Sequence, residues 1–481
     1  MTSSPLPPSG RRPAAIATVI ALSVVLCGCV SALGLPPAQL NISAKWHGRL
    51  PHGGRTSALL DWWSGFNDPA LDQLLALSEQ RSTALAVATA NIEAARATSQ
   101  SQQSGLLPSA TANASVMRSG TNADNSQKVP ASTTRSGTLD ASWELDLFGK
   151  TRNEIKAADA RVEARVSDWH DARVSLAAEV ADDYVQYRAC RLLEAAYRGE
   201  LTSQQQTIKA TELSAASGLK STADLALVRA SAASSASSLT AQAAECEVLV
   251  KSLSELTGGD ELKVRALLRS GRKGIPVPKQ FLVKSLPADL LRQRPDINSL
   301  EKELAANAFE VGAAEADLYP SLSLSGSLTL NGSSVAGKSV PWSFGPSLSL
   351  PIFDGGLRRA AVRTAKANYD AASANYRAGI LAAVKEVEVA LVHLDSAHRQ
   401  LSDATVAARE YRAYFQSVDE NWRAGGASVL DREEARRSAQ SAEITLIGLR
   451  RDAVEYWIAL YKALGGGWSA DSSPHMTKGG T

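Results

Sequence analysis

Residues 138–147 read Thr-Leu-Asp-Ala-Ser-Trp-Glu-Leu-Asp-Leu, and this stretch decides the fold. Apolar side chains occupy every second position from Leu139 to Leu147, and polar side chains occupy the positions between them. A period of two predicts a β-strand with one apolar and one polar face. Strands of about ten residues with one face for lipid and one for water are typical of membrane β-barrels.

The same alternation returns at 321–330 and at 342–352. We expect four strands, in two hairpins whose Ser/Thr/Asn/Gly-rich loops lie at 118–135 and 331–340. A half-buried sheet of a water-soluble protein gives the same alternation. The start of the chain favours the membrane interpretation over this alternative.

Two arginines, Arg11 and Arg12, precede an apolar run at 14–26 that is too short to cross a bilayer, which predicts a signal peptide. The run leads into Leu-Cys-Gly-Cys, which resembles the lipobox of bacterial lipoproteins and makes Cys29 the expected site of lipidation. By the same resemblance, Val30 at the next position permits delivery to the outer membrane. The alternative is a secreted protein that is cleaved elsewhere.

Each predicted hairpin is followed by a long proline-free run, at 150–216 and at 356–424. As helices these runs would each reach roughly 100 Å. We expect each to turn at a glycine and to return as a second helix, at 222–256 and 430–464. Apolar residues recur at alternating steps of four and three, the heptad pattern of packed helices. The seam of the second run is Ile380, Val384, Val387, Leu391, Leu394, His398, Leu401, Thr405 and Ala408.

The chain contains an internal repeat of helix, two strands and two helices. Its clearest landmark is the motif Gly218, Ser221 and Asp224, which returns with the same spacing as Gly425, Ser428 and Asp431. We therefore predict this organisation: a signal peptide (1–28), a lipid-anchored linker (29–60), a first repeat (61–260), a linker (261–290), a second repeat (291–467) and a disordered tail (468–481).

Four strands cannot close a barrel in lipid without leaving unpaired edges, so neighbouring chains must supply the rest. Three chains would give twelve strands, an even number within the range of known membrane barrels. The predicted fold is mainly α, a long periplasmic helical barrel, with four strands per protomer in a shared twelve-stranded β-barrel of a trimer.

Composition argues against several classes of function. The formal net charge of +2 is not the strong positive charge that is typical of nucleic-acid-binding proteins. No motif of a nucleophile elbow, phosphate loop or zinc protease occurs, so we expect no enzyme and no cofactor. His393 and His398 are five positions apart, on different helix faces, and no metal site is predicted.

Cys190 and Cys246 lie at equal distances from Gly218, on opposite arms of the first helical hairpin. They could form a disulfide in the oxidising periplasm if their Cα atoms approach within roughly 7 Å. Two buried free thiols are the preferred interpretation, because unpaired cysteine is often buried.

Five short motifs, in order, resemble the TolC superfamily, specifically the NodT or OprM-like outer-membrane lipoproteins of tripartite efflux systems. They are Trp62-Trp63-x-x-Phe66-x-Asp68-Pro69-x-Leu71-x-x-Leu74, Trp143-Glu144-Leu145-Asp146-Leu147-Phe148-Gly149, Arg294-Pro295-Asp296-Ile297, Tyr319-Pro320-Ser321 and Leu350-Pro351-Ile352-Phe353-Asp354-Gly355-Gly356. The resemblance implies a passive trimeric duct for small molecules. It also implies two partners, a periplasmic adaptor protein and an inner-membrane pump of the RND type.

The resemblance further implies a periplasmic gate at Trp422, Asp431 and Glu434. A ring of carboxylates around a narrow mouth favours cations. Alternatively, the two acids are only first-turn residues of the returning helix. The two tip turns, 218–224 and 425–431, are the expected adaptor-docking surface. A type I protein-secretion duct and a non-conducting trimeric coiled-coil spacer remain as alternative functions.

Overall fold

The computed structural model describes residues 62–120, 131–278, 294–466 and 468. The signal peptide, Cys29 and nearly all of the predicted tail lie outside the described residues. The described chain forms two compact units, the first containing residues 96–161 and 304–372 and the second the remainder. Each unit combines parts of both sequence repeats.

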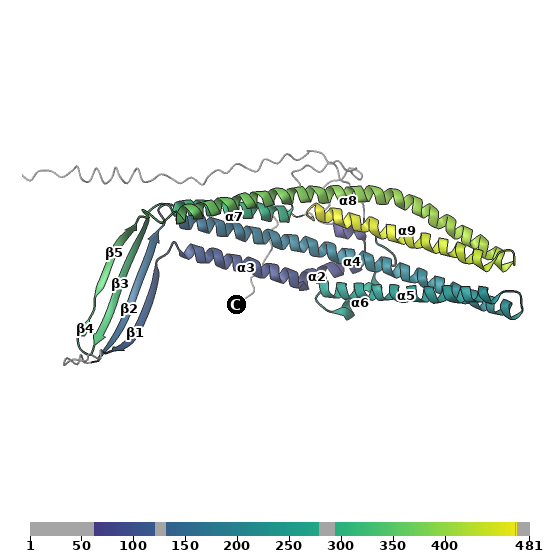
Figure 1. Ribbon diagram of the computed structural model, residues 1–481, viewed down its shortest axis with the longest axis horizontal. Coiled ribbons are helices and arrows are strands. Elements are labelled where there is room, and N and C mark those ends of the chain that lie inside the picture. Colours follow the sequence, from purple (N-terminus) through teal and green to yellow (C-terminus); the bar gives the residue numbers. More distant parts are fainter. Residues whose placement is uncertain (1–61, 121–130, 279–293, 467, 469–481) are drawn as a thin grey trace, which may run out of the picture. The chain divides into compact units, whose positions relative to one another are not determined.

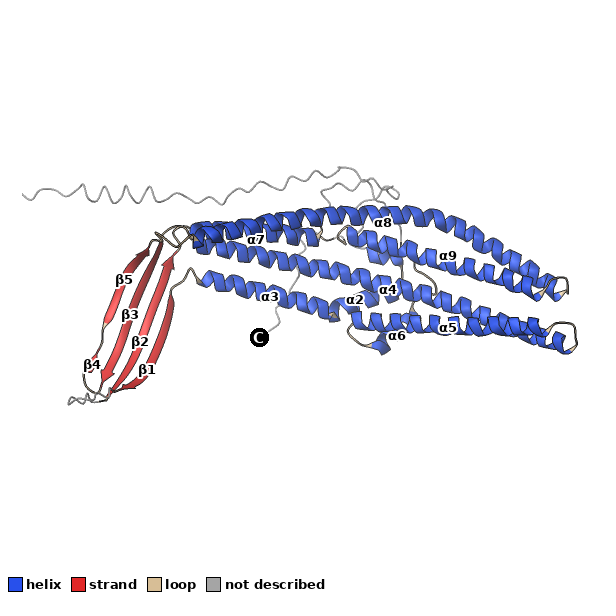
Figure 2. Cartoon of the chain, in the orientation of Figure 1, coloured by secondary structure: helices blue, strands red, loops and turns tan. Residues whose placement is uncertain are grey.

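Figure 1 and Figure 2 show the elements of the described chain in their order. They are η2 (Trp62–Phe66), α2 (Pro69–Arg81), α3 (Thr83–Ser104), β1 (Ser109–Ser119), β2 (Ser132–Leu145), α4 (Lys150–Ala216), α5 (Thr222–Leu256), α6 (Glu261–Ser270), α7 (Pro295–Ala316), β3 (Ser321–Ser333), β4 (Gly337–Ser339), β5 (Trp342–Ser349), α8 (Leu357–Arg423) and α9 (Val429–Ala463).

The repeat is visible in the helix lengths. The two long helices α4 and α8 each contain 67 residues, and the returning helices α5 and α9 each contain 35. All four predicted helices are confirmed to within one residue at each end. The segment 261–290, predicted as a linker, contains the helix α6.

The first unit contains an antiparallel sheet in the order β1, β2, β3, with β4 and β5 both paired to β3. β4 and β5 are two pieces of one edge strand, because the Thr329 N–H donates to the Pro341 carbonyl between them, at 2.9 Å. Proline has no N–H to give to the ladder, which explains the interruption. The strands also run further into the predicted hairpin loops than expected, to Ser119 and Ser333.

The second unit has a hydrophobic core where α4, α8 and α9 meet the N-terminal motif that begins at Trp62. Trp62 stacks on Tyr461 with ring centroids 4.8 Å apart. Asp68 caps α2 by accepting from the Ala70 N–H, and its second oxygen accepts from the Tyr184 hydroxyl at 2.6 Å. The Trp62–Asp68 motif therefore fixes the first of the described residues against the long helices.

Cys190 on α4 and Cys246 on α5 are joined in a disulfide, with Cα atoms 5.7 Å apart. The structure differs here from the preferred interpretation of two free thiols. Because the two cysteines lie equally far from the turn, the antiparallel helices place them side by side. Within the described residues, no helix combines the length and the apolar character needed to cross a lipid bilayer.

Candidate functional site

The register of the sheet places the apolar side chains of the strands on one face, except Met117 of β1, which lies opposite Thr134 on the other face. Leu139 of β2 lies opposite Ala112 of β1 and Leu328 of β3, and Leu328 lies opposite Trp342 of β5. Directly opposed residues in an antiparallel pair point to the same side. This face is open: Trp342 is 76% exposed and Leu139 is 52% exposed.

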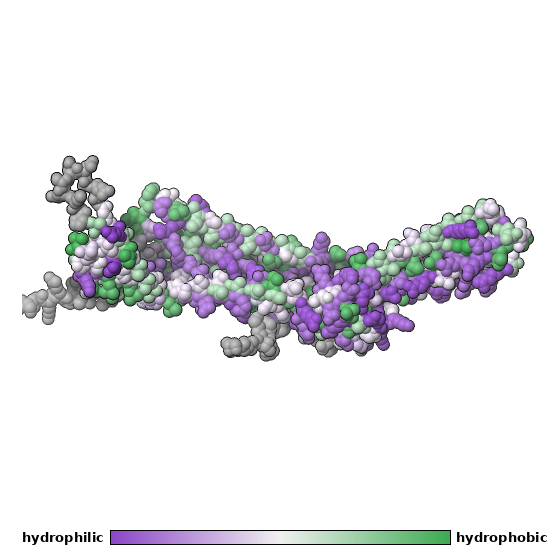
Figure 3. All heavy atoms as spheres, turned by 90° about the horizontal axis from the view of Figure 1, so that it is seen from below, coloured by the Kyte–Doolittle hydropathy of each residue, from purple (hydrophilic) through white to green (hydrophobic). Residues whose placement is uncertain are grey.

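The opposite face is lined by hydroxyl groups that bond across the strands. Ser115 and Ser136 are 2.8 Å apart, and Ser327 and Ser343 are 3.0 Å apart. Figure 3 shows that apolar residues, in green, reach the surface of the sheet beside polar ones. An exposed apolar face backed by a hydroxyl-lined face matches a strand layer between lipid and water. It does not match a sheet packed on a soluble core.

The outer edges of the sheet, on β1 and on the β4–β5 strand, have no partner strand among the described residues. Their backbone N–H and C=O groups need partners that a single sheet in lipid cannot provide. The sheet is therefore incomplete by itself.

At the two tips of the second unit, the predicted turn residues adopt matching conformations. Gly218 and Gly425 have φ of +74° and +83°, the left-handed region that only glycine adopts without strain. Each tip then starts its returning helix with a capping box. At the second tip the Ser428 hydroxyl accepts from the Asp431 N–H at 3.1 Å, and the Asp431 carboxylate accepts from the Ser428 N–H at 3.0 Å. Ser221 and Asp224 do the same at the first tip.

The predicted gate residues lie close to the second tip. The hydrogen bonds from the Ser428 hydroxyl and N–H hold the pKa of the Asp431 carboxyl below its usual value. Asp431 and Glu434 are exposed, one helical turn apart on α9. Trp422 is half-buried, and the Arg432 guanidinium lies 4.5 Å from its ring centroid. The structure thus brings Trp422 next to the helix that carries the two acids.

A buried charged cluster lies beside this tip, and no sequence pattern predicted it. Arg432, Glu433 and Arg436 of α9 are 4%, 0% and 3% exposed. Arg436 pairs with Glu433 and with Glu200 of α4, whose Oε1 lies 2.5 Å from its Nη1. Burial raises the pKa of the Glu200 carboxyl, and the Arg436 guanidinium opposes that shift. A run of charged residues in a helix ordinarily predicts a solvent-exposed face. These residues are buried because they lie on the side of α9 that packs against other helices, and the sequence does not indicate that side.

Arg432 extends the cluster towards the tip. Its Nε donates to Asp419 of α8 at 2.5 Å, and its Nη1 donates to the Thr207 hydroxyl of α4. The cluster therefore joins α4 of the first repeat to α8 and α9 of the second. Arginine suits this place because its planar, permanently charged fork can bind two partners at once.

The described residues contain no group of histidine, cysteine, aspartate or glutamate side chains arranged to hold a metal ion.

Comparison with known proteins agrees with this geometry. The family model "Outer membrane efflux protein" matches residues 74–259 and 286–466. The chain is 30% identical to outer membrane protein OprJ of Pseudomonas aeruginosa over 98% of this chain and 99% of that protein. It is 28% identical to nodulation protein T of Rhizobium leguminosarum bv. trifolii, over 92% and 94%.

Among solved structures, the outer-membrane channel OprN superposes with a TM-score of 0.76 and 31% identity, covering 91% of this chain and 98% of that chain. The predicted fold class, a long helical part with a small sheet, is confirmed by this likeness. The resemblance stated from the five sequence motifs is confirmed as well. This chain belongs to the outer membrane efflux protein family.

Proposed function

We propose that three copies of this chain form the outer-membrane duct of a tripartite efflux system and carry small molecules out of the cell. One observation carries the proposal: the sheet has an exposed apolar face, a hydroxyl-lined face and two unpaired edges. Pooling the strands of three chains would close a wall with lipid outside and water inside. Cys29 would add a lipid anchor in the same membrane.

The long helices would continue this duct into the periplasm. There the tip turns, 218–224 and 425–431, would meet a periplasmic adaptor protein, which joins the duct to an inner-membrane pump of the RND type. The duct itself would perform no chemistry, because the energy comes from the pump. A non-conducting spacer does not require a sheet with one apolar and one hydroxyl-lined face. A protein-secretion duct would differ from a small-molecule duct in its pump and in the molecule it carries.

The first test is the conductance of the full-length protein in planar bilayers, together with its oligomeric state in detergent. We expect a trimer that conducts ions in discrete steps. A monodisperse monomer, or a trimer that inserts without conducting, would exclude the duct.

We further propose that Asp431 and Glu434 form the gate ring, with Trp422 beside it. Asp431→Asn and Glu434→Gln should raise the open probability and lower the selectivity for cations. The matched control is Asp224→Asn, because Asp224 makes the same capping box at the other tip. If Asp224→Asn changes conductance as much as Asp431→Asn, the acids are only helix caps.

Docking at the tips is tested by placing cysteines there, as Lys220→Cys and Ala427→Cys, and crosslinking them to an adaptor. Contact with an adaptor predicts crosslinks from both tips. The control is Lys273→Cys, an exposed position in the same unit and outside either turn. Equal crosslinking from all three positions would contradict docking at the tips.

A further inference from the structure

The charged residues of the sheet are sorted by sign between its two faces. The strands carry two acids, Asp140 and Glu144, and three cations, Arg118, Arg135 and Lys338. Asp140 and Glu144 lie opposite Ser327 and Ser323, on the hydroxyl-lined face. All three cations fall on the apolar face.

The register establishes this placement of the cations. Arg135 of β2 lies opposite Val116 of β1 and Gly332 of β3, and Gly332 lies opposite Lys338 of β4. Arg118 is two positions from Val116 on the same strand, so its side chain points to the same side. Three cations at the end of a largely apolar face favour an anionic environment there.

The cations lie at one end of the apolar band, next to the hairpin turns. From Leu322 to Leu330 the apolar face of β3 covers eight residue steps, about 26 Å at roughly 3.3 Å per residue. This length matches the apolar band of about 25 Å seen in membrane barrels. Arg135 and Lys338 begin just beyond Leu330, at the depth where lipid headgroups start. Long cationic side chains at such a boundary reach towards the headgroups.

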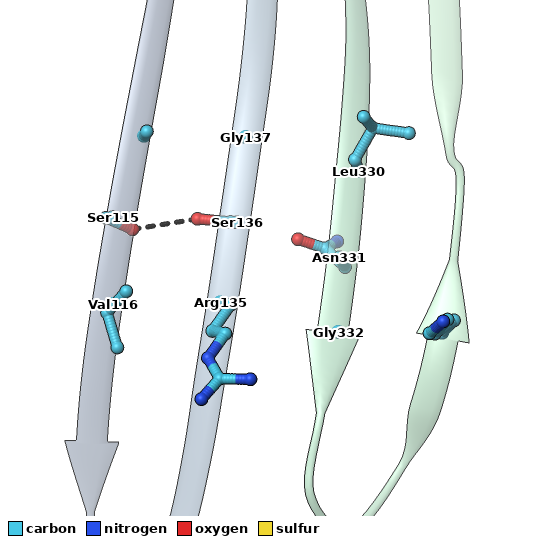
Figure 4. Close-up of a pocket in the computed structure, with 10 residues that line it drawn as sticks. Ser115, Val116, Arg135, Ser136, Gly137, Leu330, Asn331 and Gly332 are labelled. Carbon is cyan, nitrogen blue, oxygen red and sulfur yellow. Dashed lines mark hydrogen bonds between the residues drawn. The ribbon is translucent and has the colours of Figure 1, made fainter.

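A shallow hollow lies between these residues. Figure 4 shows Val116, Arg135 and Gly332 in a row across three strands, with Gly137 and Leu330 beside them. Lys338 completes the lining. Neither Gly137 nor Gly332 has an atom within 4 Å of where a Cβ would stand, so the missing side chains leave room for a ligand group.

No ion pair or hydrogen bond from the side chains of Arg118, Arg135 or Lys338 occurs within the described residues. Guanidinium groups bind phosphate through two parallel hydrogen bonds, and an ammonium adds a mobile point charge. The hollow is therefore chemically suited to a phosphate group attached to acyl chains that cover the apolar face below it.

We propose that Arg118, Arg135 and Lys338 bind the phosphate groups of the phosphorylated glycolipid that forms the outer leaflet of the outer membrane. The proposal rests on the proposed function, which puts the helices in the periplasm and hence the hairpin turns on the outer side. The chain would thereby bind one class of lipid preferentially. It would do so only at the level of the outer-leaflet headgroups, next to the hairpin turns.

The test uses the full-length trimer in detergent and native mass spectrometry. The probe is hexa-acylated lipid A with both phosphates, compared with the same lipid A after dephosphorylation. The variant is Arg118→Gln/Arg135→Gln/Lys338→Gln. Its control removes three exposed cations of the second unit, as Lys263→Gln/Arg269→Gln/Lys273→Gln.

We expect the phosphorylated lipid to bind the variant about a hundredfold more weakly, because each cation near an anionic surface contributes about fivefold. The control should bind as the unchanged protein does, and Arg118→Lys/Arg135→Lys should keep most of the affinity. Equal binding of both lipids, or equal loss in variant and control, would overturn the proposal.

Conductance and trimer formation are measured on the same samples. A variant that conducts normally and still binds lipid A contradicts only the lipid site. A protein that forms no trimer and inserts into no bilayer, with or without phosphate on the lipid, contradicts the proposed function itself.

Discussion

Replacing Arg436 with leucine removes a buried guanidinium from between the carboxylates of Glu200 and Glu433. Breaking one partner out of a buried ion pair costs roughly 3–5 kcal/mol, because the remaining charge stays desolvated. Here two carboxylates lose this guanidinium at once, Glu200 of α4 and Glu433 of α9, and Glu433 keeps only the more distant Arg432 guanidinium, at 3.6 Å. We expect the start of α9 to separate from α4 in the variant.

The assay is hydrogen exchange of the full-length protein, followed by mass spectrometry of peptides from the first turns of α9. A cost of roughly 3–5 kcal/mol corresponds to a loss of protection of roughly 150-fold to 5,000-fold. The control is Arg437→Leu, an exposed neighbour on the same helix. Peptides from α6, in the same unit, should be unchanged.

Lowering the pH should reduce the loss of hydrogen-exchange protection in Arg436→Leu. Burial already raises the pKa of the Glu200 carboxyl, and in the variant the opposing guanidinium is gone, so the pKa rises further. A raised pKa means that the folded state holds the proton more tightly than the unfolded chain, so stability increases as the pH falls through the folded pKa. Protection in Arg436→Leu should therefore recover as the pH is lowered towards 5.

Neutralising the acids should also rescue the variant. Arg436→Leu/Glu200→Gln/Glu433→Gln neutralises the two carboxylates that lose the guanidinium of Arg436, while Arg432 keeps its ion pair with Asp419, and it should recover most of the protection. Equal exchange in Arg436→Leu and Arg437→Leu, or a triple variant that is no better protected than the single one, would show that these ion pairs do not hold α9 against α4.

Three further predictions concern the disulfide, the sheet and the gate. Reduction of the Cys190–Cys246 bond should lower the free energy of unfolding by about 2–4 kcal/mol, measured by denaturant titration with and without reductant. Leu328→Lys on the apolar face should cost about 2–4 kcal/mol of membrane insertion, whereas Ser327→Lys should insert normally and alter ion selectivity; folding into lipid vesicles and conductance distinguish them. Because its hydrogen bonds lower the pKa of Asp431, the carboxylate stays charged as the pH falls to 5, and cation selectivity should persist there; loss of selectivity at that pH contradicts this.

The helices could be predicted almost to the residue, because glycine turns, capping serines and the absence of proline mark their ends in the sequence. The ends of the strands next to the hairpin loops could not be predicted as closely. Ser132, Ser333 and Ser334 read as loop residues by composition, yet Ser132 and Ser333 bond across strands at 3.3 Å. Serine suits a strand when its hydroxyl bonds across a water-facing surface, and propensity alone does not include that partner.

The seam of α8 was predicted only in part. Ile380, Val387 and Leu394 are buried as expected, but His398 is exposed and Ala383 and Ala390 take buried places instead. A heptad pattern predicts that a stripe of the helix is buried, but it does not fix the position of that stripe around the helix axis. Alanines on either side of the stripe can also be buried, because their side chains are small.

Those parts of the candidate site that depend on residues close together in the sequence could be predicted. The tip turns and caps depend on residues three positions apart. The charged cluster around Arg436 depends on Glu200, 236 positions away, and no local pattern reports such a pairing. The same limit applied to Cys190 and Cys246, whose symmetry about the turn suggested a bond without deciding it.

The two-faced sheet has a consequence for the way the protein is made. A globular domain hides its apolar residues when its own chain collapses, but Trp342 and Phe344 remain 76% and 71% exposed in the folded protomer. In the proposed duct their shelter would come from lipid, and the strand edges would be paired by sister chains. Until those partners are in place, a single copy would present an apolar face and two unpaired edges to proteases and to aggregation.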